Sequence, residues 1–166
     1  MSAIDELLAG NERYAAEPAE EGLAPAPSRR VVVVTCMDAR LDVYAALGLG
    51  RGEAHVLRNA GGVVTDDVIR SLAVSQRKLG TREVMLVHHS RCGMQSLDGE
   101  AFRAELAADA GAEPPFEIGA FADLEADVRE SISRVRESPF LPHRDAVRGF
   151  VYDVDSRQLH EVDAGG

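Results

Sequence analysis

The sequence has no tryptophan, few aromatic residues and no long apolar run. Aromatic residues make up 5% of the 166 residues, so the core must consist mainly of Val, Leu, Ala and Ile. No apolar stretch approaches the roughly 20 residues that a membrane-spanning helix needs. The first residues lack a basic segment followed by an apolar one, so no secretory signal is predicted. We therefore expect a cytoplasmic protein that does not bind membranes.

Basic residues and cysteines are also scarce. The chain has 18 Lys and Arg against 28 Asp and Glu, which gives a net charge of −10. An acidic surface repels phosphate backbones, so we expect no nucleic-acid partner. The only cysteines are Cys36 and Cys92, and a disulfide between them is disfavoured in a reducing cytosol. Lone buried cysteines usually serve as small apolar residues, so their sequence context has to decide their role.

The first 29 residues differ in character from the rest of the chain. Apolar residues at helical spacing predict a short helix over residues 3–15. Residues 16–29 are rich in Pro, Ala and Glu, which is typical of an extended arm. We therefore divide the chain into an N-terminal helix and arm, residues 1–29, and a single domain, residues 30–166. Because the helix is set apart from the main body, it can pack elsewhere, including on a partner subunit.

Strands and helices alternate from residue 31 onward. VVVVT (31–35) is an uninterrupted apolar run, typical of a strand covered on both faces in a parallel sheet. Further strands are predicted at 54–58, 83–87, 149–154 and 158–162, the last two as a hairpin. Further helices are predicted at 42–47, between Thr65 and Gly80, at 98–109, and from Phe121 to just before Pro139. This alternation predicts an α/β fold with a mainly parallel central sheet flanked by helices.

Two motifs that contain metal-binding side chains follow two of these strands. CMDAR (36–40) comes directly after the first strand, and HSRC (89–92) follows the third. Ligands bind beyond the carboxyl ends of parallel strands, so the two motifs can converge. Two thiols with an imidazole form a donor set that zinc prefers, and three protein ligands are typical of a catalytic zinc site. Asp38 is either a fourth ligand or a neighbour of the bound water, and Arg40 can pair with it.

The two motifs together resemble those of a known family. CMDAR and HHSRC are similar to the C-x-D-x-R and H-x-x-C motifs of the β-class carbonic anhydrases. RNAGG (58–62) and LLAGNERYA (7–15) resemble further segments of that family. TDDVIRSLAVSQRKLGTREVMLVHHSRCGM (65–94) resembles its short mycobacterial-type branch. The resemblance covers nearly the whole chain.

The resemblance implies a carbonic anhydrase, a zinc lyase that reversibly hydrates carbon dioxide to bicarbonate and a proton by means of zinc-bound hydroxide. Cys36, His89 and Cys92 would bind one zinc ion per subunit. Asp38 would either close the site as a fourth ligand or accept a hydrogen bond from the zinc water, and Arg40 would be its ion-pair partner. Residues 30–166 would form the zinc-binding catalytic domain. The assembly would be a homodimer, sometimes paired into tetramers, with the N-terminal helix wrapping the neighbour.

The substrate pocket is where the sequence departs from the family pattern. We expect Asn59, Gly61 and Gly93 to line this pocket. Arg91 places a long cation inside the H-x-x-C motif, where the family pattern predicts a smaller, neutral or acidic residue. Ala39 replaces the Ser that is common between Asp and Arg. The sequence also shows no clear counterpart of the glutamine that helps to hold bicarbonate in plant-type members.

Three other functions remain open at this point. The same zinc site can hydrolyse carbonyl sulfide or carbon disulfide, which release of hydrogen sulfide would reveal. A non-catalytic, zinc-stabilised oligomeric domain would keep Asp38 permanently on the metal and hydrate no carbon dioxide. A redox pair of Cys36 and Cys92 would carry little metal. His88 adjoins His89 on a strand, so we expect its side chain to point to the other face of the sheet and to serve packing.

Overall fold

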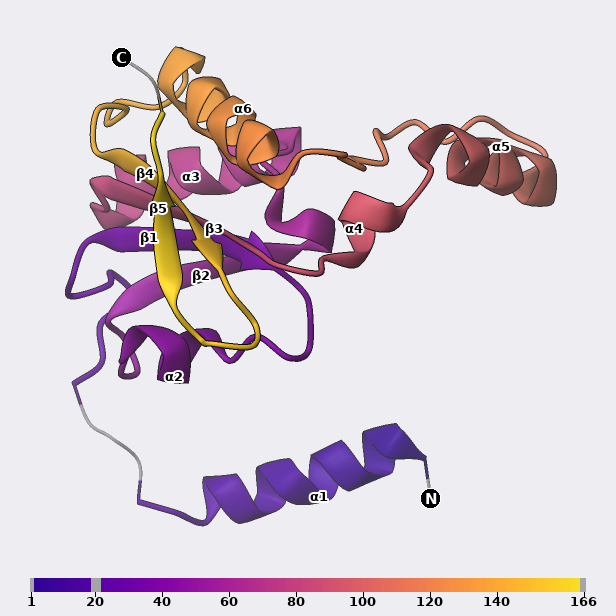
Figure 1. The fold of residues 1–166 in the computed structure, drawn as a ribbon. Coiled ribbons are helices and arrows are strands. Elements are labelled where there is room, and N and C mark those ends of the chain that lie inside the picture. The colour runs from indigo at the N-terminus through magenta and orange to yellow at the C-terminus, as the bar shows by residue number, and fades with distance from the viewer. Residues whose placement is uncertain (1, 19–21, 165–166) are drawn as a thin grey trace.

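The computed structural model describes residues 2–18 and 22–164 (Figure 1). The strands in these ranges are β1 (Val31–Cys36), β2 (Ala54–Asn59), β3 (Glu83–His89), β4 (Val147–Tyr152) and β5 (Leu159–Val162). The helices are α1 (Ala3–Ala15), α2 (Val43–Leu47), α3 (Asp66–Leu79), α4 (Gly93–Ser96), α5 (Gly99–Ala110) and α6 (Leu124–Glu137), with a 3₁₀ turn at Ala60–Gly62. None of the helices described is long and apolar enough to cross a membrane.

The strands form one sheet in the order β2-β1-β3-β4-β5. The pairs among β2, β1, β3 and β4 are parallel, and β5 runs antiparallel to β4. The predicted α/β fold, with a mainly parallel sheet and a C-terminal hairpin strand, is therefore confirmed. The register pairs Cys36 with Asn59 and Thr35 with Val87, so the carboxyl ends of β2, β1 and β3 lie side by side.

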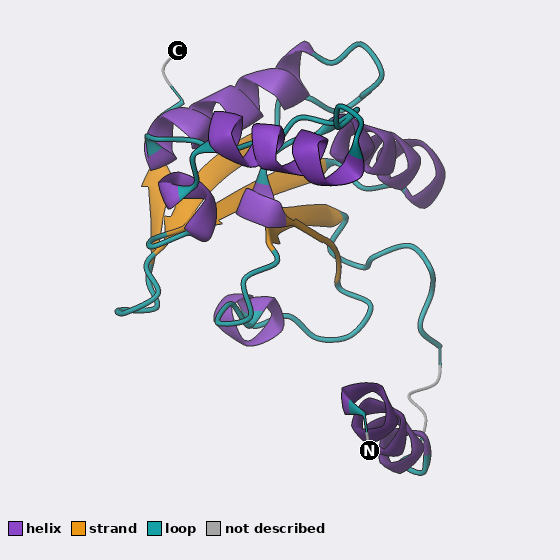
Figure 2. Ribbon diagram, turned by 90° about the vertical axis from the view of Figure 1, so that its right-hand side faces the viewer, coloured by secondary structure: helices purple, strands orange, loops and turns teal. Residues whose placement is uncertain are grey.

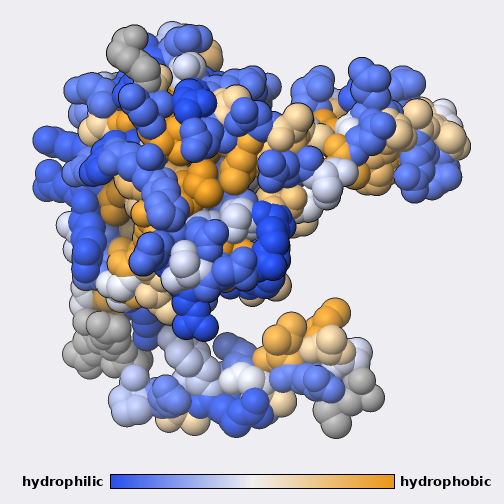
Figure 3. All heavy atoms as spheres, in the orientation of Figure 1, coloured by the Kyte–Doolittle hydropathy of each residue, from blue (hydrophilic) through white to orange (hydrophobic). Residues whose placement is uncertain are grey.

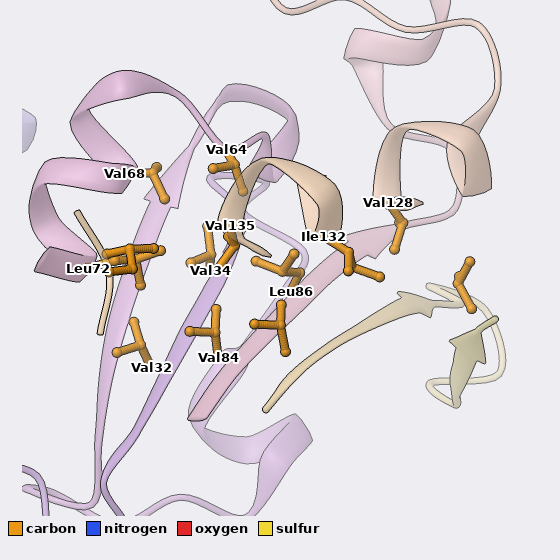
Figure 4. Close-up of a cluster of buried hydrophobic side chains, with 13 residues drawn as sticks. Val32, Val34, Val64, Val68, Leu72, Val84, Leu86, Val128, Ile132 and Val135 are labelled. Atoms are coloured by element: carbon orange, nitrogen blue, oxygen red, sulfur yellow. The ribbon is translucent and has the colours of Figure 1, made fainter. Parts of the chain in front are cut away.

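Helices cover both faces of this sheet (Figure 2). The larger core lies beneath α3 and α6, and Figure 4 shows its side chains meeting between these helices and the strands. Its fully buried members include Val32, Val34, Leu72, Leu86, Val128 and Val135. The smaller core on the opposite face includes Val33, Leu41, Val43, Val87 and Tyr152. Alternate residues of β1 thus enter different cores, which explains why the run VVVVT shows no polar alternation.

Several element boundaries differ from the prediction for local reasons. α6 begins at Leu124 because the Asp123 side chain accepts a hydrogen bond from Ala126 N–H and caps the helix there. Phe121 therefore precedes this helix, and its predicted place in the first turn was wrong. β4 ends at Tyr152 because the carboxylate of Asp153 accepts backbone N–H groups of the following turn. The short helix α4 was not predicted.

Gly149 is a point of close approach between β4 and α6. A Cβ atom at this position would lie 2.8 Å from Ile132 Cδ1, and still closer to Val128 Cγ1. We expect Gly149→Ala to lower the free energy of unfolding by about 1–3 kcal/mol, because both neighbours are buried and must shift. Urea unfolding would measure the change. Gly10→Ala is the control, since its Cβ would make only an ordinary 3.8 Å contact. Equal midpoints for the two variants would contradict this account.

The helix α1 stands apart from the sheet (Figure 1). The capping box of Ser2 and Asp5 closes its N-terminus, so the helix begins where the sequence predicts it. None of its residues is buried, and Ile4, Leu7 and Leu8 are all exposed. Figure 3 shows apolar atoms gathered on one side of α1. This helix therefore offers an apolar face that no described part of the same chain covers.

Candidate metal centre

The sheet brings the two cysteines and His89 together at the carboxyl ends of β1 and β3. Cys36 is the last residue of β1, His89 is the last residue of β3, and Cys92 directly precedes α4. All three side chains are buried, and their ligand atoms lie within 4.8 Å of one another. The two sulfur atoms are 4.0 Å apart. The motifs that are separated in the sequence therefore converge on one spot.

The imidazole of His89 is oriented as a metal ligand would be. Its Nδ1 lies 2.9 Å from the carbonyl oxygen of Ser90, and a carbonyl only accepts, so Nδ1 must carry the proton. Nε2 then has a free lone pair. It is buried and has no hydrogen-bond partner among the described residues. A buried nitrogen without a partner is costly, whereas a ligating histidine normally shows this arrangement. The donor set therefore fits a metal ion such as zinc.

The pKa values of the two thiols are shifted in opposite directions. Burial raises the pKa of Cys36, but a protonated His89 imidazole and the N–H groups of Asp38 and Gly61 outweigh burial and lower it to about 7. Burial raises the pKa of Cys92; the Met94 N–H opposes this, and a charge on Cys36 adds to it. The protein alone thus favours one thiolate, and a bound cation would favour the second.

Asp38 and Arg40 form a fork-shaped ion pair beside this cluster. Arg40 donates from Nε to Oδ1 at 2.9 Å and from Nη2 to Oδ2 at 2.6 Å, and its backbone N–H also reaches Oδ1. These hydrogen bonds from Arg40 hold the pKa of Asp38 well below its usual range, although burial opposes them. Asp38 Oδ2 lies 3.7 Å from His89 Nε2. The carboxylate is therefore ionised and stands at the edge of the cluster.

Arg58 braces the CMDAR segment, a role that the motif RNAGG does not reveal by itself. Its Nε donates to the Cys36 carbonyl at 3.0 Å, and its Nη2 donates to the Asp38 carbonyl at 2.7 Å. The next residue, Asn59, was predicted to line the substrate pocket. Its side-chain amide nitrogen donates to the Val63 carbonyl at 2.8 Å. In this structure Asn59 thus stabilises the glycine turn that follows β2.

The three glycines near the cluster differ in how much space surrounds them. The backbone N–H of Gly61 helps to lower the pKa of Cys36. Gly62 has a φ of +74°, and a Cβ there would lie 2.8 Å from the Cys36 backbone nitrogen, so only glycine fits. A Cβ at Gly93 would meet no atom within 4 Å. Open space therefore adjoins Cys92 at Gly93, whereas Gly62 lets the turn approach β1 and Gly61 lets it pack against Met94 and Phe121.

His88 points away from the cluster, as predicted from the alternation along β3. It is fully buried, and its Nε2 lies 2.6 Å from Asp127 Oδ2 of α6. Its ring also packs against Phe121, with 5.7 Å between the ring centroids. His88 therefore joins the sheet to α6 and does not reach the candidate metal site.

These features define an α/β protein with a candidate metal centre beyond the carboxyl ends of its parallel strands. The family model described as carbonic anhydrase matches residues 31–108. The chain is 47% identical to Beta-carbonic anhydrase 1 of Mycobacterium tuberculosis over 163 residues, which cover 98% of this chain and 99% of that protein. The chain therefore belongs to the β-carbonic anhydrase family of enzymes, as the sequence motifs predicted.

The chain is also similar to a solved carbonic anhydrase structure and to an enzyme with a different named substrate. The crystal structure of carbonic anhydrase from Streptococcus mutans has a TM-score of 0.87 and 42% identity, and covers 98% of this chain and 99% of that one. Carbon disulfide hydrolase of Acidithiobacillus thiooxidans is 35% identical over 158 residues, covering 80% of this chain and 72% of that protein. Enzymes with different named substrates are thus related to this chain.

Proposed function

We propose that this chain catalyses the reversible hydration of carbon dioxide with one zinc ion per subunit, held by Cys36, His89 and Cys92. The observation that carries the proposal is the buried, partnerless Nε2 of His89 beside two sulfur atoms. Membership of the β-carbonic anhydrase family supports the reaction. Zinc, when bound, lowers the pKa of a coordinated water to about 7, which makes a nucleophile available at neutral pH.

In this proposal Asp38 and Arg40 are the catalytic pair. Arg40 engages both carboxylate oxygens of Asp38, which keeps Asp38 ionised and turned away from the metal position. Oδ2 nevertheless remains close enough to the cluster to accept a hydrogen bond from the attacking water and to orient it. For Asp38 to act instead as a fourth ligand, its bonds to Arg40 would have to break. The geometry thus favours a site that is open to substrate.

We further propose that substrate reaches the cluster beside Gly61 and Gly93. A Cβ atom at Gly93 would meet no atom within 4 Å, so open space adjoins Cys92 there, whereas Gly61 packs against Val63, Met94 and Phe121 and would line the path with its backbone. Asn59 would act on this pocket mainly through the glycine turn that it braces.

We also propose that residues 1–29 pack on a second copy of the chain, while residues 30–166 form the catalytic domain. The exposed Ile4, Leu7 and Leu8 of α1 favour such a partner, because an apolar helix face in water is unfavourable. The assembly would be a homodimer or a pair of dimers. Measuring the mass in solution of the chain and of an Ile4→Asp, Leu7→Asp, Leu8→Asp variant would test this, with dissociation of the variant as the expected result.

Hydrolysis of carbonyl sulfide or carbon disulfide is the second candidate function. It is favoured by the carbon disulfide hydrolase relative, which matches most of this chain. The residues proposed to hold zinc would serve both reactions, because each substrate presents an electrophilic carbon to a nucleophilic water. The substrate preference therefore has to be measured.

Stopped-flow assays across about pH 6–9 would test the proposed function. We expect the chain to carry about one zinc ion and to hydrate carbon dioxide, with a kcat/KM above that for either sulfur-containing substrate. Hydrogen sulfide would report the sulfur reactions on the same preparation. Faster release of hydrogen sulfide would favour the hydrolase. Bound zinc without hydration at any pH would indicate the non-catalytic domain, and a preparation with little metal would indicate the thiol pair.

A further inference from the structure

Arg91 is unusual in two respects, its backbone conformation and its charge. Its φ is +55°, a left-handed conformation that costs a residue with a side chain about 1–2 kcal/mol. It also places a cation between His89 and Cys92, in the segment that leads from β3 into α4. A strained backbone persists only where the surrounding structure holds it. The neighbouring contacts must therefore hold Arg91 in this conformation.

The turn between β4 and β5 holds this segment at three points. Ser90 N–H donates to the Tyr152 carbonyl at 2.9 Å. Ser90 Oγ accepts a hydrogen bond from Val154 N–H at 3.0 Å. The guanidinium of Arg91 pairs with the carboxylate of Asp155. The H-x-x-C segment is thus attached to a turn that lies more than 60 positions further along the chain.

The turn itself is well fixed by short-range hydrogen bonds. The Asp153 carboxylate accepts N–H groups from Asp155 at 3.0 Å and from Ser156 at 2.7 Å. The Asp153 carbonyl accepts Arg157 N–H at 2.8 Å. The backbone that carries Asp155 is therefore held in place, so Asp155 offers Arg91 a counter-ion at a defined position.

The backbone of Arg91 connects this ion pair to the candidate active site. Its carbonyl accepts a hydrogen bond from Arg40 Nη2 at 3.0 Å. The same nitrogen donates to Asp38 Oδ2 at 2.6 Å. A continuous set of contacts thus runs from the exposed Asp155 through Arg91 and Arg40 to Asp38. The left-handed conformation of Arg91 aims the carbonyl at Arg40 while the side chain points out to Asp155.

We propose that Arg91 is a positioning residue whose ion pair with Asp155 fixes the carbonyl that holds Arg40, and thereby keeps Asp38 turned away from the metal. This inference rests on the proposed function. The Arg91 side chain is 59% exposed and that of Asp155 is 71% exposed, so this cation lies at the surface and is neutralised there. An ion pair in this position is screened by salt, which makes the orientation of Asp38 sensitive to ionic strength.

Three variants separate the ion pair from the backbone strain. Asp155→Asn removes the counter-ion. Arg91→Gly removes the side chain while retaining a residue that adopts a positive φ without strain. The third variant combines both changes. Each is compared with the unaltered chain in zinc content, in kcat/KM for carbon dioxide, and in the visible absorption of the cobalt(II)-substituted protein. This absorption changes when a carboxylate takes the place of water on the metal.

We expect each single change to lower kcat/KM by about two- to fivefold at low ionic strength, which is the range for an exposed ion pair. The cobalt spectrum should shift towards the carboxylate-bound form, and zinc content should stay the same. The double variant should resemble either single variant, because both single changes remove the same Arg91–Asp155 ion pair. Raising the ionic strength from about 0.01 M to about 1 M with sodium sulfate should bring the unaltered chain to the level of Asp155→Asn.

Glu161→Gln is the matched control. It removes another exposed carboxylate from the same hairpin, one that pairs with Arg148 and lies outside the chain of contacts. We expect it to leave the cobalt spectrum and kcat/KM unchanged. The inference is overturned if Asp155→Asn matches the unaltered chain in both readouts, if the two single effects add in the double variant, or if Glu161→Gln has the same effect. If the unaltered chain hydrates no carbon dioxide, the proposed function fails, while the cobalt spectra still test the positioning role.

Discussion

His89→Ala is expected to abolish zinc binding and carbon dioxide hydration together. Nε2 of His89 is the only imidazole donor in the cluster, and the two remaining sulfur atoms cannot form a three-ligand site. Substitutions of residues that merely orient metal ligands usually cost about 10- to 100-fold in metal affinity or activity, so loss of a ligand should exceed about 100-fold. Elemental analysis of the purified protein and stopped-flow hydration would measure the two losses.

Two further variants show whether the loss is specific. His160→Ala removes an exposed histidine on β5 and should retain zinc and full activity. Cys36→Ser replaces a sulfur by an oxygen with little change in volume, and should lose zinc to a similar extent as His89→Ala. Circular dichroism would confirm that each variant is folded. Normal zinc content in folded His89→Ala would refute the assignment of this ligand.

The convergence of the two motifs could be predicted because it depends on sheet topology. An uninterrupted apolar run, VVVVT, predicts a strand buried on both faces, and such strands occur in parallel sheets. In a parallel sheet the residues after each strand lie at the same edge. Cys36 and His89 therefore had to lie at one edge, and neighbouring strands bring them within reach. Alternation along β3 likewise predicted that His88 and His89 point to opposite faces.

The supporting contacts could not be predicted in the same way. Arg58 holds two carbonyl groups of the CMDAR segment, and Asp155 pairs with Arg91 across 64 positions of sequence. Neither contact follows from a strand period or from a motif, because each depends on how loops and side chains pack. The sequence marked Arg91 as unusual for the family. Only the structure shows that its side chain points out of the site and its carbonyl points in.

Asp38→Asn should lower the kcat/KM for carbon dioxide by about 10- to 100-fold while zinc content stays near one per chain. The amide has nearly the shape of the carboxylate, but it is neutral and offers Arg40 one acceptor atom in place of two. It would therefore orient the attacking water poorly. Zinc should remain bound, since Cys36, His89 and Cys92 are intact. Stopped-flow rates normalised to zinc would separate this result from simple loss of metal.

The same variant distinguishes the two roles that remain open for Asp38. If Asp38 closed the site as a fourth ligand, the amide would bind zinc more weakly, and the variant would be more active than the unaltered chain at neutral pH. If Asp38 orients water while Arg40 holds it, activity falls at every pH. Asp67→Asn is the control, because it weakens an exposed ion pair with Arg70 of the same chemical type on α3, and should change nothing. The Asp38–Arg40 fork, which engages both carboxylate oxygens at 2.9 and 2.6 Å, leads us to expect the fall.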